Sequence, residues 1–151
     1  MTVREEILAA LCSVVTAAAG AVADAEILVT RNAVLAERLD GVTSAWVNLL
    51  DGGADGEPQA LMGAGWEFNH VARVEIYVRG DDDSDRDARF DRIVSAIAAA
   101  IAADATLGGL ADYAEAQSVE EPGLDELGLT IGFKVGIVPI LILYDAPTRA
   151  G

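Results

Sequence analysis

One strongly alternating segment constrains the fold of this chain more than any other part of its sequence. Between Val71 and Arg79, apolar side chains alternate with a second set that carries the charges; the apolar set is Ala72, Val74, Ile76 and Val78. Successive side chains of a β-strand point to opposite faces, so this period of two predicts a half-buried strand. Its other face, with Arg73, Glu75 and Arg79, is expected to meet solvent or a partner.

Two further segments carry apolar residues at helical spacing. The first runs from Val3 to about Ala21, and its larger apolar residues recur at three- and four-residue steps: Ile7, Leu8, Leu11, Val14, Val15 and Val22. Thr2 and Glu5 before it have the pattern of a capping box. The second runs to about Ala103, with Phe90, Ile93, Val94, Ile97 and Ile101 on one side. Both segments are predicted to be amphipathic helices.

The remaining strands are predicted from shorter patterns. Apolar and polar side chains alternate over residues 44–50, which predicts a strand. This strand is expected to end at the glycines of residues 51–53, before a polar loop. A short strand is expected over residues 113–119. Residues 134–147 are apolar on both faces and are predicted to be covered on both, with Pro139 marking an irregularity or an edge. Residues 26–30 form a short apolar run, and a helical turn is possible before Gly41.

These elements predict one domain over residues 1–151. The expected class is α+β, with two amphipathic helices packed on an antiparallel sheet of about four to five strands. At 151 residues the chain is long enough to bury a proper core. No internal repeat or linker divides it, and no stretch has the roughly 20 large apolar residues of a membrane span.

The charge of the chain is strongly negative. Its formal net charge is −15, from 25 acids and 10 bases. No base lies between Arg92 and Lys134, where the acids are Asp104, Asp112, Glu115, Glu120, Glu121, Asp125 and Glu126. Phosphate backbones are bound by clustered cations, so this composition disfavours nucleic-acid binding. The acids form either a solvated face or a wall that repels a polyanion.

The densest acidic run, at residues 81–87, stands at the entrance of the second helix. Acids at a helix cap and in the first turn suit the exposed amides there, which explains one or two of the five carboxylates. The alternate spacing also resembles an EF-hand calcium loop. That loop needs glycine at its sixth position and glutamate at its twelfth, where this chain has Arg86 and Arg92. No metal site is therefore predicted.

No residue set predicts catalysis or a cofactor. Cys12 is the only cysteine and sits at helical spacing from Leu8 and Val15, as a buried hydrophobe would. His70 is the only histidine, so it is either a lone acid–base group or a structural residue. The glycines of residues 63–65 lead into a strand instead of a helix, which excludes a dinucleotide-binding turn. The chain is expected not to be an enzyme.

Four motifs in this order resemble one family: residues 49–53 (LLDGG), the strand of residues 73–78, residues 103–110 (ADATLGGL) and the closing LILYDAP. The chain resembles the tail terminator proteins, similar to minor tail protein U, of long-tailed phages and phage-like gene transfer agents. The resemblance implies a virion structural protein that forms a hexameric ring. That ring would cap the tail tube at its head-proximal end and join it to a head-completion, or stopper, protein. The protein would be made in the host cytoplasm, with no cofactor and no membrane contact.

The resemblance also implies where partners bind. The loop between the first two strands would contact the tail tube, with candidate residues Asp51, Asp55, Glu57, Leu61 and Met62. Exposed apolar and aromatic residues supply interface anchors, and the candidate subunit interface is Trp66, Arg73, Glu75, Ile137 and Ile140. Trp46 and Trp66 could instead simply fill the core.

DNA would pass through such a ring without specific binding. Cations in the lumen would bind phosphates, whereas a negative wall gives a slippery channel. Either the aspartate run or the base-free region would face this lumen; the candidates are Asp81, Asp82, Asp83, Asp85, Glu115, Glu120 and Glu121.

Three alternatives remain open from the sequence. The first is another head–tail connector or head-completion ring protein of the same particle. The second is a small cytoplasmic enzyme or transferase, which predicts a monomer or dimer with a deep pocket, and the third is a ligand-binding domain. Residues 123–139 look longer than a minimal terminator needs, which leaves the strand count open.

Overall fold

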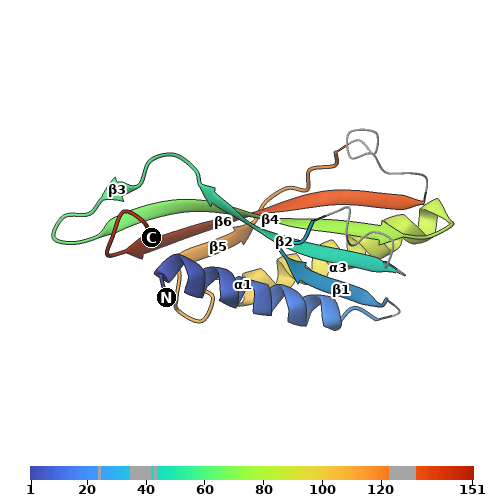
Figure 1. The fold of residues 1–151 in the computed structure, drawn as a ribbon. Helices are drawn as coiled ribbons and strands as arrows, with labels where there is room; N and C mark the ends of the chain where they lie inside the picture. Colours follow the sequence, from blue (N-terminus) through green and yellow to red (C-terminus); the bar gives the residue numbers. More distant parts are fainter. Residues whose placement is uncertain (24, 35–41, 43, 123–131) are drawn as a thin grey trace.

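The computed structural model describes the whole chain except residues 24, 35–41, 43 and 123–131. Two helices, α1 (Val3–Gly20) and α3 (Asp83–Ala103), pack on one sheet (Figure 1). The strands are β1 (Ile27–Arg31), β2 (Ala45–Ala54), β3 (Gln59–Ala60), β4 (Trp66–Arg79), β5 (Tyr113–Ala116) and β6 (Phe133–Ala146). Their order is β1-β2-β4-β6-β5, with β3 paired to β4. The pairing is antiparallel except between β1 and β2, which confirms the predicted α+β class.

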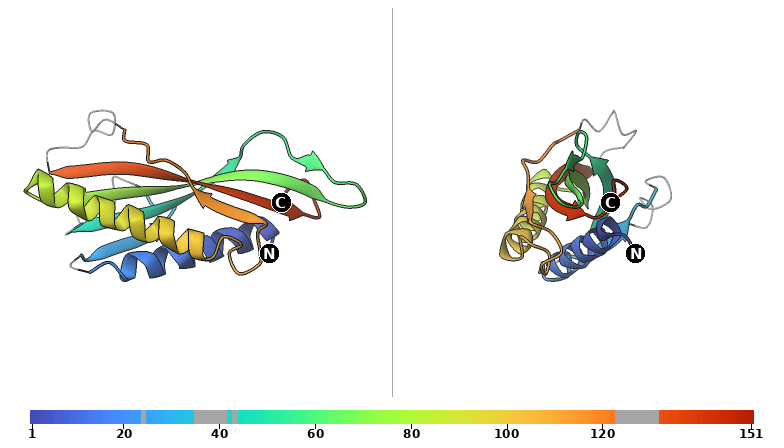
Figure 2. Two further views of the ribbon diagram at one scale, coloured as in Figure 1. Left: turned by 180° about the vertical axis from the view of Figure 1, so that it is seen from behind. Right: turned by 90° about the vertical axis from the view of Figure 1, so that its left-hand side faces the viewer.

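Both helices lie on the same side of the curved sheet (Figure 2). α1 begins as predicted, because the Thr2 hydroxyl accepts a hydrogen bond from the Glu5 backbone N–H at 3.1 Å. The apolar stripes of the two helices and the apolar face of the sheet form the main core; its members include Leu11, Val15, Val74, Ile76, Phe90, Ile97, Ile140 and Ile142. The alternation between Val71 and Arg79 thus places its apolar set under the helices.

Three strand boundaries differ from the predictions, and one of them is that of β5, which ends at Ala116 and not at residue 119. β2 does not stop at residues 51–53 but continues to Ala54, and its register with β4 shifts between Leu50 and Gly53. Gly52, with φ of +66°, absorbs this bulge, so the glycines kink the strand instead of ending it. β4 also begins earlier than its clearest alternation, at Trp66. The predicted helical turn before Gly41 falls outside the described residues.

β6 is a central strand with one well-covered face. Its helix-facing residues are buried, whereas Ile137, Leu141 and Leu143 on the other face are only half-buried among the described residues. Pro139 does mark an irregularity. β5 leaves the ladder after Ala116 pairs with Ile140, and pairing resumes at a single bridge from Glu120 to Ile137. Pro139, which has no N–H to donate, therefore lies where the chain after β5 leaves the ladder with β6.

Candidate functional site

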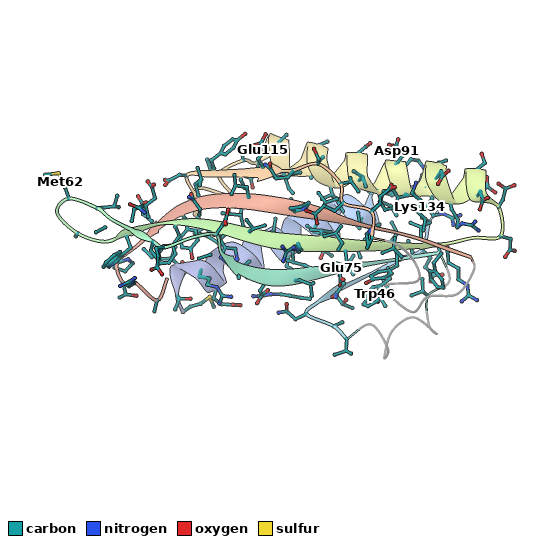
Figure 3. All side chains as sticks on the ribbon, turned by 90° about the horizontal axis from the view of Figure 1, so that it is seen from above. Trp46, Met62, Glu75, Asp91, Glu115 and Lys134 are labelled. Atoms are coloured by element: carbon teal, nitrogen blue, oxygen red, sulfur yellow. The ribbon has the colours of Figure 1, made fainter. Side chains whose placement is uncertain are left out.

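A hairpin arm projects from one end of the molecule. It consists of residues 55–65, between the end of β2 and the start of β4, and extends past the N-terminus of α1 (Figure 1). Met62 is fully exposed at its tip, far from the other labelled side chains (Figure 3). Asp55 and Glu57 are also exposed, and Leu61 is half-buried. Four of the five residues predicted to contact a tube therefore lie on one projecting element.

Asp51, the fifth, belongs to the body. The guanidinium of Arg31 on β1 donates to Asp51 at 2.7 Å and to Glu5 of α1 at 2.8 Å, so one arginine joins the helix to two strands. Hydrogen bonding to Arg31 lowers the pKa of Glu5. Burial alone would raise the pKa of Asp51, but hydrogen bonds from Arg31 and Asn32 outweigh it, and the pKa is lowered. Asp51 thus anchors the base of the arm.

His70 supports the bulge from which the arm departs. Its side chain is buried on β4, and its Nε2–H donates to the backbone carbonyl of Asp51 at 2.6 Å. Burial lowers the pKa of His70, and the nearby positive charge of Arg4 lowers it further, against the opposing effect of the hydrogen bond. This favours the structural alternative for His70. No local pattern announces this role, because the accepting carbonyl lies 19 positions away.

The described residues leave part of the sheet face opposite the helices uncovered, beside a buried cluster that contains Trp46, Tyr77 and Val135. Along β4 and β6 this open sheet face carries a half-buried apolar row; the row is Val71, Ile137, Pro139, Leu141 and Leu143. Arg73 stands exposed beside this row, paired in register with Pro139 and Leu50. Within the part of the chain that the structure describes, its guanidinium has no hydrogen bond or ion pair. Arg73 also borders a shallow hollow with Asp55 and Val71 at the base of the arm.

Two residues of the predicted subunit interface are positioned differently from the expectation. Ile140 is fully buried under the helices, because neighbouring residues of a strand face opposite sides, and it is unavailable to a partner. Trp66 is half-buried and lies under the guanidinium of Arg149 at 5.3 Å. Trp46, by contrast, is fully buried and stacks on Tyr77.

Glu75 takes part in a polar network farther along the same face, where Asn48 and Tyr77 are buried. Asn48 donates to one of its carboxylate oxygens at 2.9 Å, and the Tyr77 hydroxyl donates to the other at 3.0 Å. Asn48 is itself fixed by Thr30, whose hydroxyl also accepts from the Trp46 indole N–H. Burial, with the charge of Glu75, raises the pKa of Tyr77. These neutral donors satisfy the hydrogen-bonding capacity of the Glu75 carboxylate within the subunit, so Glu75 helps to keep this face rigid.

The two acidic regions meet on one side of the molecule. Asp82 caps α3 through the Ser84 N–H, and Asp83 pairs with Arg86. Lys134 of β6 lies within ion-pair distance of both Asp87 and Glu121, which joins the aspartate run to the base-free region. Asp81 and Asp85 flank Asp82 and Asp83 in the sequence, Glu120 precedes Glu121, and all three are exposed. Glu115 is exposed on β5. From the sequence, either the aspartate run or the base-free region was expected to face the lumen. In the structure, parts of both regions lie next to Lys134.

In the described part of the chain, neither the helices nor the polar side chains indicate a membrane or metal site. None of the described helices is long and apolar enough to cross a membrane. In the described residues, no group of three or more His, Cys, Asp and Glu side chains is arranged to hold a metal ion. Cys12 is a free, half-buried cysteine on α1.

No protein-family model matches the chain, and none of the curated proteins compared with it is similar enough to count as a match. The interpretation of its surfaces therefore depends on the arm, the open sheet face and the acidic side themselves.

Proposed function

We propose that this chain is a tail terminator of a long-tailed phage or a gene transfer agent. Six copies form a ring that caps the tail tube at its head-proximal end and joins it to a stopper protein. The observation that carries the proposal is the projecting arm with exposed Met62 at its tip. It leaves the body where the resemblance expects the tube-contacting loop, and a flexible thioether side chain adapts well to a partner surface.

The open sheet face supports assembly into a ring. It presents a half-buried apolar row and Arg73, an exposed arginine with no partner among the described residues, and arginine is enriched among residues that dominate binding energy. The helices occupy the other side of the sheet, so the two sides of a subunit differ (Figure 2). Contact between unlike sides is head-to-tail, and such contacts close into rings when the rotation permits.

The joined acidic regions support passage of DNA. Each chain carries a net charge of −15, and six copies arranged with Asp81, Asp85 and Glu120 toward the lumen would repel phosphates. DNA then moves through without being held. The proposal assigns the protein no catalytic step and no cofactor, and it places the finished ring in the virion.

Electron cryomicroscopy of tailed particles from the producing cell tests this function. The expected result is sixfold density at the joint between tube and head that fits this fold, with the arm directed toward the tube. Absence of the chain from intact, infective particles would contradict the proposal. Deletion of its gene should yield tails of uncontrolled length that fail to join heads.

A further inference from the structure

We propose that Arg149 is a latch that holds the projecting arm in one direction. It is a positioning residue for whatever the arm binds. The latch itself stands on the geometry below, whereas the identity of the bound component, the tail tube, rests on the proposed function.

Arg149 contacts the leg of the arm that leaves the body and Trp66, the first residue of β4, where the returning leg joins the body. Its Nη2 lies 2.6 Å from Oε2 of Glu57, in the leg that leaves the body. Its guanidinium carbon lies 5.3 Å from the centre of the Trp66 ring, at the end of the returning leg. A guanidinium over an indole face is attracted by the ring as well as by the carboxylate. One side chain therefore clamps the base of the hairpin.

The clamp comes from a fixed part of the molecule. Arg149 follows β6, whose last residue, Ala146, pairs with Trp66. Gly151 is buried, close to the side chains of Arg4 and Tyr144, and its N–H donates to the Thr148 carbonyl at 3.2 Å. Residues 147–151 thus follow β6 at one end and are buried at Gly151 at the other, while residues 147–150 between them are exposed. Arg149 projects from this segment to the arm.

The arm needs such a contact. Among the described residues, the backbone of its outgoing leg is tied to β4 by the hydrogen bond from the Asp55 N–H to the Asn69 carbonyl and by the two paired positions of β3. The hydrogen bond from the Leu61 N–H to the Gly65 carbonyl links its two legs near the tip. A two-stranded hairpin alone is marginally stable in water. Among the residues that the structure describes, the Glu57–Arg149 pair is the one ion pair that the arm makes. Without the Glu57–Arg149 ion pair, the direction of the arm depends on its backbone hydrogen bonds and on the bulge at its base.

The contact between Arg149 and Glu57 is also weak enough to break when a partner binds. The side chains of Arg149 and Glu57 are 62% and 80% exposed, so water and salt screen their attraction. We therefore expect the arm to keep one direction before binding and to adjust when a partner supplies better contacts.

Hydrogen exchange of the isolated protein tests the latch directly. Amides of residues 55–61 are compared in the wild type, Arg149→Ala, Glu57→Ala, the double variant, and Arg149→Lys. Arg92→Ala, which removes an exposed arginine from α3, is the matched control. In Arg149→Ala these amides should exchange about two- to fivefold faster, the range for an exposed ion pair, while the β4 core amides stay unchanged. The lysine variant should restore part of the protection.

The double variant supplies the second criterion. If the two residues act as one latch, the double variant should exchange no faster than Arg149→Ala, and the difference should shrink in molar salt. Exchange in Arg149→Ala equal to that in Arg92→Ala would overturn the proposal, as would fully additive effects of the two single changes.

Binding to purified tail tubes separates this inference from the proposed function. If the wild-type chain fails to bind tubes, the proposed function fails, and the exchange result still decides the latch. If the wild type binds and Arg149→Ala binds several-fold more weakly, the positioning role is supported. Equal binding by both proteins would overturn that role.

Discussion

The ammonium nitrogen of Lys134 lies 2.9 Å from Oδ1 of Asp87, a residue 47 positions away in the sequence. The same nitrogen is 3.6 Å from Glu121 and 5.0 Å from the centre of the Phe90 ring. The only lysine of the chain thus sits where its two acidic regions meet.

Replacing Lys134 with methionine should destabilise the protein by about 0.5–1 kcal/mol at low salt, because the acids around it lose their shared counter-charge. Added salt should recover much of the loss. The hydrogen bond with Asp87 raises the pKa of Lys134, so its stabilisation is complete below the unfolded pKa and disappears as pH rises through the folded one. Urea unfolding at two salt concentrations measures this. Arg92→Met is the control, and an equal effect there would contradict the local explanation.

The bulge at Gly52 predicts a sharp contrast between adjacent glycines. A Cβ on Gly52 would collide with the carbonyl oxygen of Val71, and its positive φ disfavours other residues. Gly52→Ala should cost at least about 2 kcal/mol of unfolding free energy. A Cβ on Gly53 would meet nothing within 4 Å, so Gly53→Ala should be nearly neutral. Denaturant titration of both variants tests the bulge, and equal losses would refute it.

His70 predicts a loss of stability in mild acid. Its folded pKa is lowered, chiefly by burial, so the folded state favours the neutral ring. Its contribution is complete above the unfolded pKa of about 6.5 and is lost as pH falls from there toward the folded value. Unfolding free energies between pH 7.5 and 5 should decline, and His70→Gln should flatten this decline. An NMR titration that gave His70 an ordinary or raised pKa would contradict the prediction.

The position of Arg73 leads to a prediction about where neighbouring subunits contact each other. In the proposed ring, Arg73→Glu puts a negative charge on the open sheet face and should reduce assembly on tail tubes at least tenfold, a typical hot-spot loss. The thermal midpoint of the isolated subunit should stay nearly unchanged, because this exposed side chain has no partner in the described residues. Arg92→Glu makes the same charge change on the helix side. Sedimentation of tube-bound protein compares them, and normal assembly of Arg73→Glu would exclude this face.

The sequence predicted the elements whose pattern is local. The helical spacing of Leu11 and Val15, and of Ile93 and Ile97, is set within single helices, so α1 and α3 appeared nearly at their observed bounds. The alternation of β4 likewise assigned its helix-covered face correctly, whereas on the other face Tyr77 is buried instead of meeting solvent. The boundary of β2 was wrong because glycines that usually end a strand here accommodate a bulge, and the bulge depends on pairing with β4.

The candidate site was predicted only in outline. The loop with Asp55, Glu57 and Met62 was found as one segment, but its shape as an arm depends on the pairing of β3 with β4. Ile140 was assigned to an interface because an all-apolar strand does not reveal which of its faces is covered. The helices decided that, and they bury Ile140.

The sequence by itself determined both helices and the approximate positions of β2, β4, β5 and β6, but not β1 or β3. It also determined that the chain is strongly acidic and that the face of β4 with Arg73 and Glu75 carries the charges. Only the tertiary structure decided what each charged residue does. Arg31 meets Asp51 across 20 positions, Lys134 meets Asp87 across 47, and Arg149 meets Glu57 across 92. Periodicity is a property of neighbours along the chain, whereas these contacts depend on strand order and register. Those arise only when the whole sheet is assembled.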